Sequence, residues 1–204
     1  MILPLHLDLK GLPVLVVGGG PRSSRWIYVL IESGARIRVC SPKLDFELEA
    51  LAKAKRFSWR RRDFLPADLA GVGLVIAASE DSRLNRIALA KAQARKLLAI
   101  SADPALTGNA WQPPHFRRGG LLIHFSLLGR GKPGPVDEEL RNYLKRRLGR
   151  AFGREWELLW EELARLRRSL PLRKLLPAWL RAAKRGRVQK IRRDMEKMLR
   201  RPGS

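Results

Sequence analysis

The chain has 204 residues and a formal net charge of +23, because 42 residues are Lys or Arg and only 19 are Asp or Glu. Hydrophobic residues make up 45% of the sequence, too many for a disordered chain, so it can bury a core as one domain or as a compact domain with a smaller one. No apolar run near the start approaches the roughly 20 residues of a membrane span, and the single cysteine, Cys40, excludes an intramolecular disulfide and a multi-cysteine metal site.

The N-terminus and the cysteine content indicate the cellular setting. The first residues carry Asp8 and have no basic region ahead of an apolar stretch, which is unlike a secretory signal. A single cysteine fits a reducing compartment. We therefore expect a cytoplasmic protein.

The first half of the chain alternates between strand and helix patterns. The apolar run Pro13–Val17 ends in three glycines, which predicts a buried parallel strand and its turn. Helical spacing follows over Arg25 to Ser33, and Gly34 stands where a helix commonly ends. The later patterns predict strands at Arg36–Cys40, Phe57–Trp59, Leu74–Ala78 and Leu97–Ser101, and helices at Asp45–Ala54 and Arg83–Ala94. This order predicts an α/β fold with a parallel sheet covered on both faces.

The second half has a different pattern. Leu121–Leu127 predicts a strand with no evident parallel partner, and residues 129–135 predict a Gly/Pro loop. From Val136 onward the spacing is helical. Residues 141–204 hold 21 basic and only 6 acidic residues, so the excess charge is concentrated in these helices.

A glycine-rich motif follows the first strand and opens the first helix. Read from Gly18 as G-x-G-x-x-S, it has Gly18 for a tight turn, Gly20 for close approach of a pyrophosphate, and Ser23 as the small residue for helix–strand packing. The N–H groups at the helix N-terminus would bind the phosphates. The motif alone is weak evidence, but its position at the first βα turn favours a Rossmann-like, dinucleotide-binding domain. The alternative is a Gly-rich turn that binds nothing.

The residues at the end of the second strand do not show whether the dinucleotide is NAD or NADP. An acidic residue often holds the ribose there, but the stretch from Val39 to Lys43 contains no acid, so this rule does not separate NAD from NADP. Ser41 could bond a ribose hydroxyl and Lys43 could reach a phosphate. The residues predicted to bind the cofactor are Gly18, Gly19, Gly20, Pro21, Arg22, Ser23, Ser41, Pro42, Lys43, Ala78 and Ser79.

Several segments in continuous order resemble precorrin-2 dehydrogenase, the N-terminal module of siroheme synthases, which in some members is also a sirohydrochlorin ferrochelatase. They are LPLHLDLKGLPVLVVGGG, SGARIRVCSP, LVIAASEDSRLN and ISADP, and the resemblance covers residues 2 to about 150. It implies NAD as cofactor, precorrin-2 as a tetrapyrrole substrate, and a homodimer. It also implies a division into an NAD-binding domain (1–113), a dimerisation segment (114–148) and a C-terminal helical domain (149–204).

Asp103 is the residue predicted to be catalytic. The family places its key acid at the end of a core strand in a pattern close to N-V-V-D, which matches Ile100 to Asp103 here, with Ile100 in place of the Asn. Independently, open α/β sheets bind ligands at the carboxyl ends of their strands, and a carboxylate there could take the proton that a tetrapyrrole sheds after losing a hydride. The alternative is a turn-forming Asp before Pro104.

Other family positions are altered. The family pattern S-[ST]-G-G-x-S-P corresponds to Ser126 to Pro133 in this chain, where two of its hydroxyl residues are replaced. These losses argue against chelatase activity more than against dehydrogenase activity. Candidate anchors for substrate carboxylates are Arg117, Arg118, Ser126 and Lys132. No histidine pair has metal-ligand spacing, so we predict no bound metal, with iron only as a possible substrate.

The basic helices have more than one interpretation. They could be solvated helices with apolar stripes inside, a surface that steers an acidic substrate, or a nucleic-acid binder. The tryptophans of this region fall on apolar stripes, which disfavours base stacking. We therefore expect a dehydrogenase whose basic surface attracts precorrin-2; the alternatives are a degenerate homologue that binds NAD or tetrapyrrole without turnover, and a nucleic-acid binder.

Overall fold

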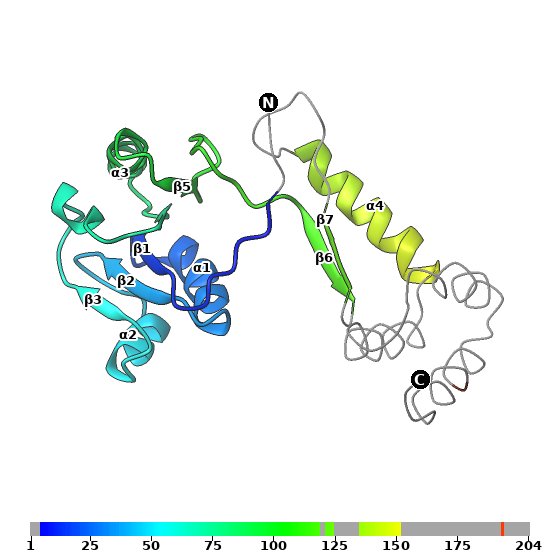
Figure 1. The fold of residues 1–204 in the computed structure, drawn as a ribbon, viewed down its shortest axis with the longest axis horizontal. Coiled ribbons are helices and arrows are strands. Elements are labelled where there is room, and N and C mark those ends of the chain that lie inside the picture. Colours follow the sequence, from blue (N-terminus) through cyan, green and yellow to red (C-terminus); the bar gives the residue numbers. More distant parts are fainter. Residues whose placement is uncertain (1–4, 119–120, 125–134, 152–192, 194–204) are drawn as a thin grey trace, which may run out of the picture. The chain divides into compact units, whose positions relative to one another are not determined.

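The computed structural model describes residues 5–118, 121–124, 135–151 and 193, and the chain divides into two compact units, Met1–Gln112 and Pro113–Ser204. The first unit is an α/β domain (Figure 1). Its elements are β1 (Pro13–Val17), α1 (Pro21–Glu32), β2 (Arg36–Cys40), α2 (Phe46–Lys53), β3 (Ser58–Arg60), a 3-10 turn η1 (Pro66–Leu69), β4 (Leu74–Ala77), α3 (Ser82–Ala94) and β5 (Leu98–Ser101). The predicted alternation of strands and helices is therefore confirmed.

The five strands form one parallel sheet in the order β3-β2-β1-β4-β5. The chain builds outward from β1 to β3, then crosses back to place β4 on the other side of β1. The strand order thus reverses between β1 and β4. In open α/β sheets this switch point, at the carboxyl ends of the strands, is where ligands bind.

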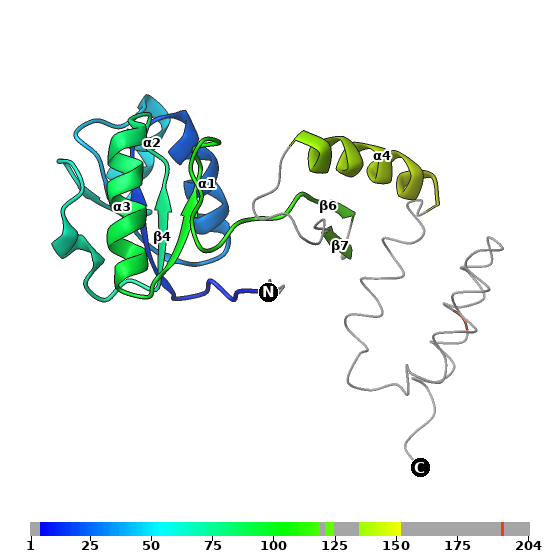
Figure 2. The same ribbon diagram turned by 90° about the horizontal axis from the view of Figure 1, so that it is seen from above.

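Alternation of side chains along each strand separates two buried clusters, one on each face of the sheet. On one face Val14 and Val16 of β1 pack with α1 and α2, through side chains such as Ile27 and Leu48. On the other face Leu15 and its neighbours pack against α3. Figure 2 shows α1 and α3 on opposite sides of β4. The helices thereby cover both faces, as the continuous apolar strands require.

Boundaries differ slightly from those predicted. The largest difference is α1, which begins at Pro21 rather than Arg25 because Pro21 supplies the fixed φ that suits a first helical position. Its end matches the prediction, since Gly34 follows the cap residue Ser33 with φ +74°. The short turn η1 was not predicted.

The second unit corrects one expectation. Leu121–Leu127 was expected to be a strand without a local partner, but β7 (Leu121–His124) pairs antiparallel with β6 (His115–Arg118). The strand β6 was missed because its sequence, HFRR, has one apolar residue and no clear alternation. The helix α4 (Pro135–Ala151) follows and confirms the helical pattern from Val136. The remaining predicted helices and the loop of residues 129–135, apart from Pro135, lie outside the described residues.

A buried carboxylate holds the sheet edge near β2 and β3. Asp68 is fully buried, forms ion pairs with Arg60 and Arg62, the latter at 2.7 Å, and accepts the Leu65 N–H at 2.9 Å. The hydrogen bond from Arg62 keeps the pKa of Asp68 well below its usual range. Burial, and then the nearby Asp68 charge, raise the pKa of Cys40 to about 12, so this buried thiol stays protonated at neutral pH.

Asp68→Asn should lower the free energy of unfolding at pH 7 by about 2 kcal/mol, because a buried charge is removed from two partly exposed arginines. The folded pKa of Asp68 is depressed, so its stabilisation is complete above the unfolded value of about 4 and is lost as the pH falls through the folded pKa. Denaturant unfolding of wild type and variant should therefore converge in acid. Asp63→Asn, which removes an exposed charge nearby, is the control and should leave stability unchanged.

Candidate active site

Four loops meet at the carboxyl edge of the sheet. Backbone hydrogen bonds hold them together: Gly18 N–H donates to the Cys40 carbonyl at 2.9 Å, Ala78 N–H to Val17 at 2.8 Å, and Ala102 N–H to Ala77 at 2.9 Å. The turn after β1 thereby lies beside the ends of β2 and β4, and the end of β5 lies beside β4. The predicted cofactor residues and Asp103 therefore belong to one edge.

The glycine turn has little room for side chains. Gly18 has φ +117°, and a Cβ there would lie 2.6 Å from the Ser79 nitrogen. A Cβ on Gly19 would lie 2.1 Å from the Lys43 carbonyl oxygen, so the turn also packs against the loop after β2. Gly20 differs, because its nearest neighbour would be the Glu80 Oε1 atom at 3.4 Å. A Cβ on either of the first two glycines would therefore clash with backbone atoms, whereas a Cβ on Gly20 would make only ordinary contact.

The N-terminus of α1 is suited to bind an anion. Gly20 is its N-cap and supplies no side-chain hydrogen bond, and Pro21 occupies the first turn. Pro21 has no N–H, and the Ser23 N–H donates to the Gly20 carbonyl at 2.9 Å, so an anion here would face the Arg22 N–H and the positive end of the helix dipole. Ser23 packs here as predicted: it is fully buried and its hydroxyl donates to the Ala78 carbonyl at 3.0 Å. The turn, the uncapped helix and the adjacent Arg22 fit the pyrophosphate of a dinucleotide.

The loop after β2 is held by internal hydrogen bonds. The Ser41 hydroxyl donates to the Lys43 carbonyl at 2.6 Å, and the Ser41 carbonyl accepts the Trp59 indole N–H at 2.8 Å. Ser41 is buried, whereas Pro42 and Lys43 are exposed. The predicted contacts of Ser41 and Lys43 with ribose and phosphate stay predictions.

Asp103 is a buried carboxylate, only 3% exposed, at the end of β5. The Ser82 hydroxyl donates to its Oδ2, and the Ala105 N–H donates to its Oδ1 at 2.9 Å. These bonds, the Ser82 bond first, hold the pKa of Asp103 below its usual range despite burial, with a smaller contribution from the charge of Arg22. The carboxyl group is therefore ionised at neutral pH, and its bond to Ala105 shows that it also shapes the turn.

Arg22 joins the cofactor turn to Asp103. Its Nε lies 3.3 Å from Glu80 Oε2, and its Nη1 donates to the Ser79 carbonyl at 3.3 Å and lies 3.9 Å from Asp103 Oδ2. Neither Glu80 nor Ser82 was predicted from the sequence to belong to the site. Both follow β4, and only the placement of β4 between β1 and β5 brings them to the site.

Asn85 supports this arrangement from α3. It is fully buried, its Oδ1 accepts the Ser79 N–H at 2.9 Å, and its Nδ2 donates to the Ser79 carbonyl at 2.7 Å. A buried Asn on an otherwise apolar helix face was the available signal for it. It fixes the backbone of Ser79, which in turn accepts the Arg22 hydrogen bond.

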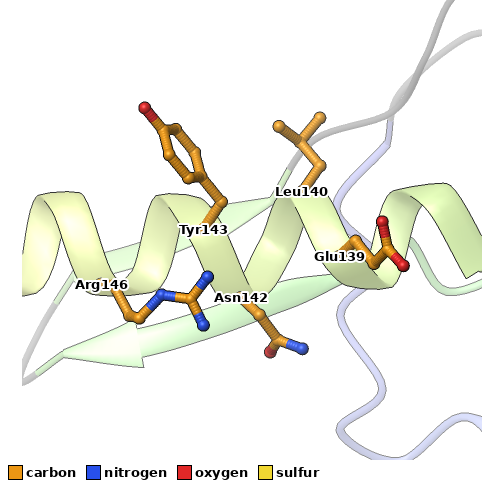
Figure 3. A pocket seen from close by; sticks show the side chains of 5 residues that line it. All are labelled: Glu139, Leu140, Asn142, Tyr143 and Arg146. Carbon is orange, nitrogen blue, oxygen red and sulfur yellow. The ribbon is translucent and has the colours of Figure 1, made fainter.

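The predicted substrate anchors lie in the second unit. Arg117 and Arg118 are on β6, and Ser126 and Lys132 lie outside the described residues. A surface hollow of about 490 Å³ lies on α4. Figure 3 shows the side chains of α4 that line it. Its lining side chains are Glu139, Leu140, Asn142, Tyr143 and Arg146. None of these residues was predicted to take part in a site.

In the part of the chain that the structure describes, no group of three or more His, Cys, Asp or Glu side chains could hold a metal ion. Of the helices within the described ranges, none is long and apolar enough to cross a membrane.

With this geometry, the comparisons with known proteins identify the family. A model described as "Putative NAD(P)-binding" matches residues 5–113, the unit that carries the glycine turn and Asp103. The chain belongs to this family. Siroheme synthase 1 of Yersinia enterocolitica is 42% identical over 127 residues, which are 62% of this chain and 27% of that protein. Siroheme synthase 1 of Aeromonas salmonicida is 34% identical over 128 residues, again 27% of its length.

The predicted resemblance is thus confirmed, although the chain spans only about a quarter of the length of these relatives. A solved structure, "SirC, precorrin-2 dehydrogenase", has a TM-score of 0.74 with 23% identity. The match covers 96% of this chain and 100% of that one. At this identity the match shows the fold: the parallel α/β sheet of a putative NAD(P)-binding protein.

Proposed function

We propose that this family member is a dehydrogenase that oxidises precorrin-2 to sirohydrochlorin with NAD, in the synthesis of siroheme. The observation that carries the proposal is the buried, ionised carboxylate of Asp103 at the switch-point edge that also holds the glycine turn. The similarity to siroheme synthases supports the substrate class, and the family supports a nicotinamide dinucleotide.

The residues at the carboxyl edge of the sheet would have different roles. The Gly18–Gly20 turn and the N-terminus of α1 would hold the pyrophosphate. When bound, NAD supplies the hydride acceptor. Asp103 would accept the proton that the oxidised tetrapyrrole releases, while Ser82 and the Ala105 N–H keep its carboxylate oriented.

Two further properties belong to the proposal. The protein acts as a homodimer, and the basic surface attracts the carboxylates of precorrin-2. Iron insertion into sirohydrochlorin is a second candidate activity, because it also requires protons to leave pyrrole nitrogens and Asp103 could accept them.

The test is anaerobic turnover of freshly generated precorrin-2 with NAD, and with NADP in a parallel reaction. Sirohydrochlorin formation that requires NAD supports the proposal, and iron added to the same cuvette decides the chelatase question. Folded protein that binds NAD without turnover would instead indicate a degenerate binding module. Retention on nucleic acid that falls steeply with salt and ignores NAD would favour the nucleic-acid alternative.

The pH dependence gives a separate prediction. Because the pKa of Asp103 is lowered, its base form persists through the neutral and mildly acidic range. We expect kcat/KM for precorrin-2 to stay nearly constant from about pH 8 down to about pH 5, since an ordinary Asp already titrates near 4. Initial rates at constant ionic strength measure this. In Ser82→Ala the acidic limb should move to higher pH, because loss of the Ser82 hydrogen bond raises the pKa of Asp103. An activity loss near neutral pH in the wild type would contradict the prediction.

A further inference from the structure

A carboxylate lies beside two of the residues that are predicted to bind the pyrophosphate. Glu80 Oε1 is 3.4 Å from the position that a Cβ on Gly20 would take, and Glu80 Oε2 is 3.3 Å from Arg22 Nε. Gly20 is the N-cap of α1 and supplies no side-chain hydrogen bond. Helix N-termini and guanidinium groups recognise carboxylates and phosphates by the same chemistry. The side chain of Glu80 therefore imitates the anion that the turn is shaped to hold.

The contact is easily exchanged. The side chains of Glu80 and Arg22 are 56% and 35% exposed, and a solvated pair of this kind contributes little stability. The backbone around it is fixed, because Asn85 holds both the N–H and the carbonyl of Ser79. The Glu80 side chain can therefore leave Arg22 with little loss of stability, while the backbone of the loop keeps its position.

We propose that Glu80 competes with the pyrophosphate of the dinucleotide for Arg22, and that it thereby lowers the affinity for the cofactor. This rests on the dinucleotide-binding part of the proposed function. Arg22 also lies 3.9 Å from Asp103. Replacement of Glu80 by the pyrophosphate at Arg22 would therefore change the charge near the proposed base. Arg22 thus links the cofactor turn to Asp103.

A double-mutant cycle on NAD binding, measured by calorimetry on the full chain, tests this proposal. Glu80→Gln should tighten NAD binding by about three- to tenfold, because it removes the competitor's charge and keeps its shape. Arg22→Met should weaken binding by about tenfold, since a charge-assisted contact to phosphate is lost. In the Arg22→Met background, Glu80→Gln should change the affinity by less than about twofold, the remainder being direct repulsion of the pyrophosphate.

The control is Glu32→Gln at the other end of α1. It removes the same charge from an exposed side chain about 18 Å along the helix and should leave NAD binding unchanged. Arg22→Lys should retain part of the Glu80 effect, which a purely structural role would not explain. Melting temperatures confirm that every variant is folded.

Three outcomes would overturn the proposal. Glu80→Gln could leave the affinity unchanged or weaken it, or it could tighten NAD binding equally with and without Arg22. In each of these cases NAD binding by the wild type survives, and the proposed function with it. If neither the wild type nor any folded variant binds NAD or NADP, both the inference and the dinucleotide part of the proposed function fail together.

Discussion

Asp103→Asn is expected to lower kcat for precorrin-2 oxidation by about 10²- to 10⁴-fold, the range that a positioned general base supplies. The amide keeps the size of the carboxyl group, and its oxygen can still accept the Ala105 N–H that shapes the turn. It cannot accept the proton. NAD affinity should change by less than about threefold, because the contact between Asp103 and Arg22 of the cofactor turn is long, at 3.9 Å.

Anaerobic stopped-flow turnover gives kcat, and calorimetry gives the NAD affinity. Ser82→Ala is the matched control: it removes the hydroxyl that donates to Asp103 Oδ2 but leaves the carboxylate in place. Its loss of rate at pH 8 should be much smaller than that of Asp103→Asn. Comparable rates in Asp103→Asn and wild type would show that Asp103 only shapes the turn before Pro104, and the base would have to be sought elsewhere.

The sequence predicted the features that depend on local pattern. Apolar runs ending in glycine or serine gave the strands of the sheet, and 3.6-residue spacing gave α1 to α3. The position of Asp103 at the end of β5 followed from the same reasoning, because parallel strands place their carboxyl ends at one edge.

The features that it did not predict depend on tertiary neighbours. The contact between Ser82 and Asp103 joins residues 21 apart in the chain, and it arises only because β4 and β5 are adjacent. Similarly, Arg22 was predicted to hold a pyrophosphate, yet its side chain contacts Glu80 and lies near Asp103, which no spacing rule indicates. The strand β6 is defined by pairing with β7 rather than by its own residues.

Gly18→Ala is expected to lower the free energy of unfolding by about 3 kcal/mol or more, because two costs combine. A residue with a Cβ at φ +117° costs roughly 1–2 kcal/mol. The new Cβ would also lie 2.6 Å from the Ser79 nitrogen, whose backbone is fixed by Asn85 and cannot yield easily. Denaturant unfolding measures the loss, and a stable Gly18→Ala protein would contradict the close packing of this turn.

Alanine substitutions at two other glycines distinguish the loss of stability from the loss of NAD binding. Gly71 has φ +67° with no atom within 4 Å of its Cβ position, so Gly71→Ala should show the conformational cost alone, about 1 kcal/mol. Gly20 has φ −96°, and its Cβ would make only ordinary contact with Glu80, so Gly20→Ala should fold with nearly unchanged stability. It should nevertheless weaken NAD binding by at least about tenfold, because the methyl group projects toward the place where Glu80 imitates the phosphate. Gly20→Ala should lose NAD binding but not stability, whereas Gly71→Ala should lose stability but not NAD binding. This pair of results would locate the pyrophosphate at the N-terminus of α1.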